Sequence, residues 1–343
     1  MRATLALLLI LGASAADACT TFCTRGLFGR NYDFETGTGM VMVNKRGLAK
    51  TSQRAQPASW TSRYGSVTFN QWGRDNATGG MNEKGLVVEL MWLDGTRYPK
   101  ADARPELGTL EWIQYQLDTA ATVQEVVESA KKVRISERGV PLHYLVADAS
   151  GDVAAVEFLG GELVVHRGDK LPVAVLANDP YAQSVAGQRG NSAARFTRAA
   201  KGLASATSVD AAFALLDEVA QQSTQWSIVY DLRNRAVTYR TAANREKRSL
   251  RFAELDFACA TPVRVLDVDS GRGNVASLLR DYTRAANESL VRRSTKETSF
   301  TRDTPDDEIV EAARWPEKSA CASTAQARAK PAQGTPSATT RRP

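Results

Sequence analysis

The sequence is short of histidine, and this shortage restricts the chemistry open to it. Its 343 residues include two histidines, His143 and His166. A zinc site built from several histidines is therefore excluded, and the cysteine spacing does not replace the missing ligands. A Ser-His-Asp or Cys-His arrangement would have to use one of the two. Both lie in apolar, strand-like runs that are typical of packing or surface histidines, so we expect another group to act as any catalytic base.

Long apolar runs and nucleotide-binding motifs are also missing. Beyond the first residues, no apolar run approaches the roughly 20 residues that cross a bilayer, which predicts no stable membrane insertion. No Gly-x-Gly-x-x-Gly segment opens a helix, and no phosphate-loop lysine motif is present, so a nucleotide cofactor is unsupported. We expect no metal and no organic cofactor.

The formal charge of +6 does not indicate a nucleic-acid partner. Residues 319–343 hold four basic residues and no acid, so the rest of the chain is close to neutral. No basic stripe interleaved with aromatic side chains, of the kind that nucleic-acid binding needs, stands out. Residues 319–343 are rich in Ala, Thr, Pro and basic residues, which predicts a disordered basic tail.

The first 18 residues have the pattern of a cleavable targeting segment. Arg2 supplies a positive charge, Thr4–Leu11 is a short apolar run, and the sequence Ala-Asp-Ala before Cys19 is a small-x-small cleavage site. This pattern predicts a signal peptide and an exported protein, periplasmic or secreted. Cleavage after Ala18 would make Cys19 the first residue of the mature chain.

A cysteine at the N-terminus carries a thiol and a free α-amine on one residue. Such a nucleophile needs no histidine base, because its own amine can accept the thiol proton. Cys19 has two other interpretations, a lipid-anchored cysteine and a structural cysteine. A lipid-anchored surface or binding protein also begins with cysteine, although Asp17 and the lack of leucine at position 16 fit that signal poorly. A bridge to Cys23 is excluded on a strand, where four residues span about 13 Å and a disulfide needs about 7 Å.

The four cysteines have a consequence for disulfides. Export implies an oxidising compartment in which disulfides persist. If Cys19 stays free, three cysteines remain and cannot all pair. Cys259 and Cys321 are the expected pair, with Cys23 as a buried thiol, although the sequence alone does not decide whether the bond forms.

Hydrophobic periodicity predicts hairpin-linked strands and separate pairs of helices. The expected helices are 107–117, 123–132, 192–203 and 209–220, the second capped by Thr122 with Glu125. The expected strands are 20–24, 27–33, 40–44, 67–71, 85–91, 144–147, 153–158, 163–166, 173–177, 227–231 and 236–240. This order favours a layered α+β fold over a parallel βαβ sheet. We see no linker within residues 19–300 and expect a single domain over residues 19–318.

Four further segments, taken in order behind Cys19, carry a resemblance to a known family. They are Phe28–Phe34, Gly79–Leu86, Leu176–Pro180 and Ala194–Phe196. Together they resemble the choloylglycine hydrolase family, N-terminal-nucleophile (Ntn) amidases that include penicillin V acylases and bile salt hydrolases. The resemblance implies a four-layer αββα sandwich with two mainly antiparallel sheets. It also implies a hydrolase that cleaves a linear, non-peptide C–N amide of a small molecule through a thioester on Cys19, and a possible tetramer.

The resemblance also assigns candidate catalytic residues, each matched to one family motif. They are Cys19, Arg30, Asp33, Asn82, Asn178 and Arg195. Cys19 would be the nucleophile, Arg30 would favour its thiolate, and Asp33 would hold the α-amine. Asn82 or Asn178 would donate an amide N–H to the oxyanion. Arg195 would hold the cluster in place.

Some features of the match leave the substrate open. Arg30 and Asp33 are three residues apart and would face opposite sides of a strand, so a bend or bulge must reconcile them. The segments Trp60–Trp72 and Leu90–Asp94 do not resemble bile-salt-binding loops. Neither the acyl nor the amine group is therefore predicted, and a transferase with the same acyl-enzyme remains an alternative.

Overall fold

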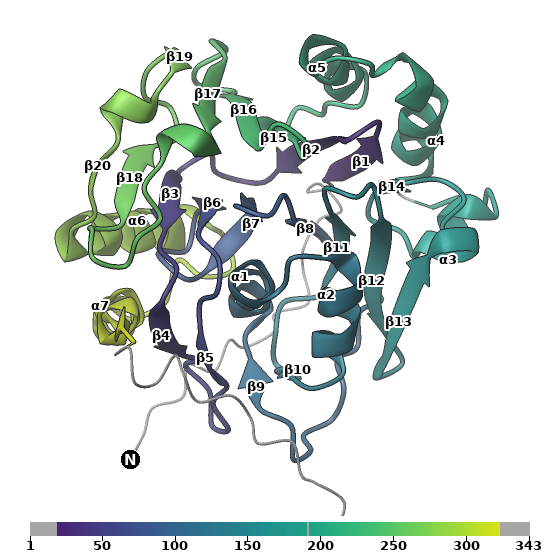
Figure 1. The fold of residues 1–343 in the computed structure, drawn as a ribbon. Helices are drawn as coiled ribbons and strands as arrows, with labels where there is room; N and C mark the ends of the chain where they lie inside the picture. Colours follow the sequence, from purple (N-terminus) through teal and green to yellow (C-terminus); the bar gives the residue numbers. More distant parts are fainter. Residues whose placement is uncertain (1–18, 191, 323–343) are drawn as a thin grey trace, which may run out of the picture.

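The structure is a computed structural model that describes residues 19–190 and 192–322. The predicted signal peptide, residues 1–18, lies outside the described residues. Two large sheets face each other and helices cover their outer faces, which gives four layers (Figure 1). The expected α+β sandwich with mainly antiparallel sheets is confirmed.

The first sheet contains seven strands and carries the beginning of the described chain. Its order is β14 (Val175–Leu176), β1 (Thr20–Thr24), β2 (Leu27–Asp33), β15 (Thr224–Asp231), β16 (Ala236–Thr241), β17 (Arg248–Arg251) and β19 (Gly273–Asn274). All neighbours are antiparallel except β17 and β19. Helices α4 (Ala193–Gly202) and α5 (Val209–Glu218) pack on its outer face. The short helix α3 (Tyr181–Val185) lies between β14 and α4 in the sequence.

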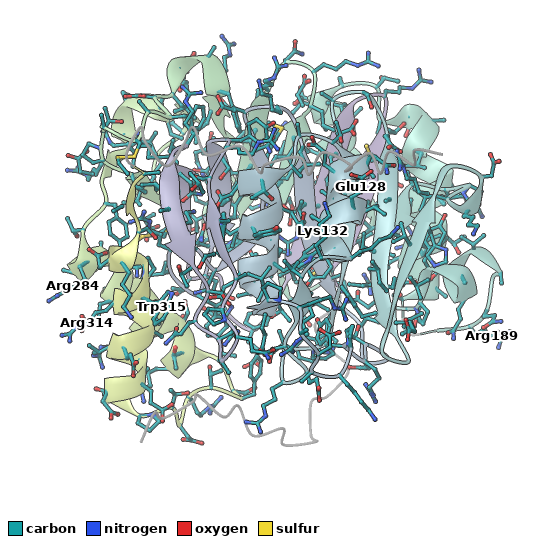
Figure 2. All side chains as sticks on the ribbon, turned by 60° about the horizontal axis from the view of Figure 1, so that its bottom comes forward. Glu128, Lys132, Arg189, Arg284, Arg314 and Trp315 are labelled. Atoms are coloured by element: carbon teal, nitrogen blue, oxygen red, sulfur yellow. A yellow bond between two sulfur atoms is a disulfide. The ribbon has the colours of Figure 1, made fainter. Side chains whose placement is uncertain are left out.

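The second sheet contains nine antiparallel strands. Its order is β13 (Glu162–Arg167), β12 (Val153–Leu159), β11 (Leu142–Ala147), β8 (Val87–Trp92), β7 (Ala77–Asn82), β6 (Ser66–Asn70), β3 (Met40–Asn44), β18 (Arg264–Asp267) and β20 (Arg280–Asp281). Helix α1 (Thr109–Thr119) packs on β7 and β8, and α2 (Val123–Ala130) follows it. Figure 2 shows the exposed side chains of Glu128 and Lys132 on this outer surface.

Smaller elements complete the described chain. Two short sheets consist of β4 (Leu48–Thr51) with β5 (Ser59–Thr61) and β21 (Ala320–Cys321), and of β9 (Glu106–Leu107) with β10 (Arg134–Ile135). Helices α6 (Arg284–Glu297) and α7 (Asp306–Arg314) pack against each other beside β3 and β18 (Figure 1). Trp315, labelled in Figure 2, follows α7 and donates its ring N–H to the Thr51 carbonyl at 2.7 Å.

Local sequence explains the hairpins and caps that the periodicity predicted. Arg25 and Gly26 form the two-residue turn between β1 and β2, and both have positive φ. Two positive φ values define the turn type whose twist matches the flanking strands, and glycine adopts them without a steric cost. Thr122 caps α2 by accepting the Glu125 N–H at 3.2 Å, as its sequence predicts.

Aromatic side chains fill much of the space between the sheets. Phe69 on β6 lies 5.1 to 6.3 Å, between ring centroids, from Trp226, Tyr230 and Tyr239 of the opposite sheet. All four side chains are buried. Edge-on contacts of this kind favour one relative placement of the two sheets, and the candidate site lies between these same sheets.

The expected strands and helices up to residue 240 are all present, with ends shifted by a few residues. Several strands were missed, among them β4, β5 and β7. Gly79 and Gly80 can be taken for a turn, but they lie in the middle of β7. A Cβ atom on Gly79 would lie 1.9 Å from the Glu89 carboxylate on β8, so the glycine makes room for a buried charge.

The boundary expected between domain and tail is wrong by a few residues. Ala320 and Cys321 pair with β4, and Cys321 is joined to Cys259 by a disulfide. The folded part therefore continues past residue 318, because this bond and the strand pairing hold the chain to the body. Residues 323–343, the rest of the expected tail, lie outside the described residues.

Candidate active site

Cys19 lies at the start of β1, where it is almost completely buried, with 3% of its surface exposed. Its Sγ lies 3.8 Å from the backbone carbonyl oxygen of Asp33. The register of the β1–β2 hairpin, in which Thr20 lies opposite Asn31, brings these two residues together. The beginning of one strand and the end of the next therefore meet at the thiol.

Arg195 connects this strand start to Asn178. Its guanidinium donates to the carbonyl oxygen of Cys19 at 2.8 Å and to the hydroxyl of Thr20 at 2.6 Å. Its other terminal nitrogen donates to the Asn178 Oδ1 at 3.2 Å. The Asn178 Nδ2 in turn donates to the carbonyl oxygen of Trp92 at 2.7 Å. These contacts fix the carboxamide with its oxygen toward Arg195 and leave one amide hydrogen beyond the bond to Trp92.

Asp33 is held from the segment that leads into β15. Its carboxylate accepts the hydroxyl of Thr224 at 2.5 Å and the side-chain amide of Gln221 at 2.9 Å. A bulge lies here, because one extra residue of β15, Gln225, separates the partners of Asp33 and Tyr32. The expected irregularity is present, but in the neighbouring strand.

Arg30 and Glu89 form a fully buried ion pair between the two sheets. The guanidinium also donates to the carbonyl oxygens of Thr78 at 3.2 Å and Leu90 at 3.3 Å. The Glu89 carboxylate accepts the phenol of Tyr230 at 2.5 Å. Arg30 is thus oriented from the second sheet, although it extends from the same strand as Asp33.

Burial dominates the protonation of the thiol. It raises the pKa of Cys19 to about 11, and the lowering effect of the Arg30 charge is too small to offset it. Burial likewise raises the pKa of Asp33, against hydrogen bonds from Thr224 and Gln221 that lower it. Arg30 favours the thiolate as expected, but the Cys19 thiol still keeps its proton near neutral pH. A base must therefore remove that proton during any nucleophilic attack.

The structure does not place Asn82 at the site. Its Nδ2 donates to the carbonyl oxygens of Leu117 at 2.9 Å and Ala120 at 2.7 Å, at the end of α1. Its Oδ1 accepts the backbone N–H groups of Lys84 and Leu86. Both amide hydrogens are used to join the β7–β8 turn to the helix. The expectation that Asn82 donates to an oxyanion is therefore wrong, while Cys19, Arg30, Asp33, Asn178 and Arg195 are brought together.

Aromatic rings gather beside this cluster. Phe34, the residue after Asp33, lies 6.3 Å from Trp72 and 6.4 Å from Phe300, centroid to centroid. Phe300 also lies 6.3 Å from Trp92, whose carbonyl oxygen holds Asn178. Phe300 is 42% exposed, although it is apolar. These rings, an aromatic rim of Phe34, Trp72, Trp92 and Phe300, thus adjoin Asp33 along the chain and Asn178 through Trp92.

Sequence reasoning missed several residues of this cluster. Glu89 was the one that left a signal, because it is the single charged residue in the otherwise apolar run Val87–Trp92. A lone charge in a buried strand needs a partner. Tyr230, Thr224 and Phe300 left none, since nothing in their neighbourhoods distinguishes them from ordinary core or surface residues.

Among the residues at 19–190 and 192–322, no group of three or more His, Cys, Asp or Glu side chains is placed to hold a metal ion. Within the same ranges, no helix is long and apolar enough to cross a membrane.

The four layers are those of the Ntn-hydrolase sandwich, and a buried cysteine lies in them beside arginine, aspartate and asparagine. The chain belongs to the linear amide C–N hydrolases of the choloylglycine hydrolase family, whose family model matches residues 19–189.

Known proteins similar to this chain come from the same family. A penicillin V acylase of Pectobacterium atrosepticum is 32% identical over 197 residues, which is 50% of this chain and 52% of that protein. The match thus spans about half the length of this curated relative. The structure of a penicillin V acylase from Agrobacterium tumefaciens is 27% identical with a TM-score of 0.68, over 78% of this chain and 98% of that one.

A more distant structure agrees on the fold alone. A variant of the conjugated bile acid hydrolase of Clostridium perfringens has a TM-score of 0.60 at 18% identity, over 75% of this chain and 98% of that one.

Proposed function

We propose that the protein is an exported amidase that hydrolyses a linear C–N amide, with Cys19 as its N-terminal nucleophile. The observation that carries this proposal is the buried Cys19 thiol at the start of a strand, beside Arg30 and Asp33 and held by Arg195. Removal of residues 1–18 would free the α-amine next to the thiol. The reaction would then proceed through a thioester on Cys19.

The acylation step uses the α-amine as the base. The amine accepts the Sγ proton as the sulfur attacks the amide carbon, and then transfers it to the leaving nitrogen as the C–N bond breaks. An ordinary α-amine has a pKa near 8, whereas burial raises that of the Cys19 thiol to about 11. Asp33 would orient the resulting ammonium through its carboxylate. Arg30 would stabilise the developing thiolate.

Asn178 would stabilise the tetrahedral intermediate. Its carboxamide is fixed by Arg195 and by the carbonyl of Trp92, so its N–H groups do not need to reorganise during the reaction. A water molecule then attacks the thioester carbon and gives a proton to the α-amine. The carboxylic acid product leaves, and the thiol is restored.

The aromatic rim supports an apolar acyl group as the substrate portion bound next to Cys19. Phe34, Trp92 and Phe300 present ring faces or edges beside the reacting residues. An aryl or alkyl acyl chain would bury apolar surface there, worth roughly 25 cal/mol per Å². The names of the relatives favour penicillin V and conjugated bile salts as the first compounds to test.

The experiment that tests the function combines mass and turnover. Intact-mass measurement of the exported protein should give a chain that begins at Cys19 with an unmodified amine. The same preparation should hydrolyse penicillin V, a conjugated bile salt or an N-acyl amino acid. A diacylglycerol-sized mass increase with no hydrolysis would reject the amidase and support a lipid-anchored protein. Transfer of the acyl group to an added amine in place of water would identify a transferase.

Replacement of the two asparagines separates the oxyanion donor from the structural residue. We expect Asn178→Ala to lower kcat about 100- to 1000-fold with a small change in KM, because one such donor typically contributes this much. Asn82→Ala should keep kcat but lose about 1–3 kcal/mol of unfolding free energy, because the carbonyls of Leu117 and Ala120 lose their donor. Steady-state kinetics and urea unfolding measure both. A larger loss of kcat in Asn82→Ala than in Asn178→Ala would reverse the assignment.

A further inference from the structure

His143 is a fully buried histidine with a hydrogen-bond acceptor at each ring nitrogen. It lies on β11, and its Nε2 is 2.6 Å from the carbonyl oxygen of Ala177. Its Nδ1 is 3.0 Å from Oε1 of Glu157 on β12. A carbonyl oxygen has no proton to donate, so Nε2 must carry a hydrogen.

The Glu157 carboxylate is an acceptor as well. The same Oε1 accepts the backbone N–H of Tyr181 at 2.9 Å, and Oε2 lies 3.1 Å from the Nε2 of His166. Burial alone would raise the pKa of Glu157, but the hydrogen bonds and charge of His143 and the other donors hold it below its ordinary value. The ring of His143 is thus held between the Glu157 carboxylate on one side and the Ala177 carbonyl on the other.

The Ala177 carbonyl belongs to the peptide group that leads into Asn178. The N–H of that same peptide group donates to the Ser192 hydroxyl at 2.9 Å. Ser192 is in turn held by Asp179, whose carboxylate accepts its backbone N–H at 2.8 Å and its hydroxyl at 2.6 Å. One peptide plane is thus held from both sides, immediately before the side chain that donates to the oxyanion.

We propose that His143 is a positioning residue: its ring, held by Glu157, donates from Nε2 to the Ala177 carbonyl and so fixes the Ala177–Asn178 peptide group and, through it, the oxyanion donor. The proposal rests on the proposed function of Asn178. A displacement of about 1 Å in a reacting group can cost about 100-fold in rate.

The charged and titratable groups around the ring are few. Glu157 faces it from β12, His166 contacts the far oxygen of that carboxylate from β13, and Tyr181 follows from α3. On the other side, β8 places the uncharged Met91 opposite it. Glu157 is thus the one ionised group bonded to His143 among the described residues.

The hydrogen bond from Nε2 can be observed directly, because the chain has two histidines. Untagged enzyme labelled with ¹⁵N at histidine should show one ring whose Nε2 proton is protected from exchange with solvent, as the bond to the buried Ala177 carbonyl requires. His143→Gln should remove that signal, which assigns it to His143. A wild-type spectrum in which neither ring holds a protected Nε2 proton would overturn the proposal, whatever the activity of the enzyme.

Kinetics with penicillin V test the positioning role. We expect His143→Leu to lower kcat about 10- to 100-fold with KM changed less than about threefold. His143→Gln, which keeps one donor, should recover part of the loss. The matched control is His166→Gln, which contacts the same carboxylate but not the peptide group and should keep kcat. An unchanged kcat in His143→Leu would reject the positioning role. A wild-type enzyme that hydrolyses no amide would instead reject the proposed function, and the spectrum alone would then test the hydrogen bond from His143 to Ala177.

Discussion

The Cys19→Ala variant should lose amide hydrolysis by about 10⁴- to 10⁶-fold and keep its fold. Loss of a nucleophile removes the covalent route and leaves only binding and oxyanion stabilisation, a loss of this size in comparable enzymes. The fold should persist, because the hydrogen bond of the thiol to the Asp33 carbonyl oxygen is long, at 3.8 Å, and alanine keeps the Cβ atom in the core. Turnover of penicillin V and thermal unfolding of the processed chain measure the two effects.

Cys23 supplies a matched control on the same strand. Its thiol is also buried, and burial raises its pKa to about 12, so it is as little ionised as that of Cys19. Cys23→Ala should therefore keep nearly full activity. If Cys19→Ala retained activity within tenfold of the wild type, or if Cys23→Ala abolished it, the assignment of the nucleophile would be wrong.

Activity of Cys19 should also require removal of residues 1–18. The pKa of the Cys19 thiol is about 11, which leaves almost no thiolate at neutral pH unless a base is at hand. His143 is bound to Glu157 and Ala177, and His166 contacts Glu157, so neither is available for this task. The α-amine released by cleavage would supply the base. A chain that retains residues 1–18 should consequently be inactive.

The parts of the site that sequence could predict are those with a local signal. Cys19 follows a cleavage pattern, and Arg30 with Asp33 forms a recognisable Gly-Arg-x-x-Asp segment. The hairpin turn at Arg25–Gly26 was equally readable, because its backbone conformation depends on the two residues themselves. These features are decided within a few residues of chain.

The errors concern contacts between distant segments. Asn82 and Asn178 look alike in sequence, and only the position of α1 shows that both amide hydrogens of Asn82 are occupied. Gly79 looks like a turn residue until Glu89 is seen to need its space. Phe300 reaches the site from beyond residue 189, where the family match ends. Periodicity carries no information on such pairings, since they are decided by how the two sheets stack.

The second large effect is expected at the buried pair of Arg30 and Glu89. Arg30→Leu would leave the Glu89 carboxylate without a cation in a site that water does not reach. Removal of one partner of a buried pair typically costs about 3–5 kcal/mol. The double variant Arg30→Leu with Glu89→Gln should recover most of this loss, since it removes both charges together. Urea unfolding of the three chains measures the coupling.

The dependence of stability on pH gives this pair an independent signature. Burial raises the pKa of Glu89 to about 7 against the opposing charge of Arg30, while the unfolded chain has the ordinary value of 4.5. Between these values the folded state holds a proton that the unfolded state releases, so the unfolding free energy falls as pH rises and levels off above about 7. Glu89→Gln should remove this decline. Arg30→Leu removes the charge that lowers the pKa of Glu89, so in that variant the decline should continue to higher pH. If instead the unfolding free energy of the wild type rose with pH relative to that of Glu89→Gln, Arg30 would keep the carboxylate ionised throughout.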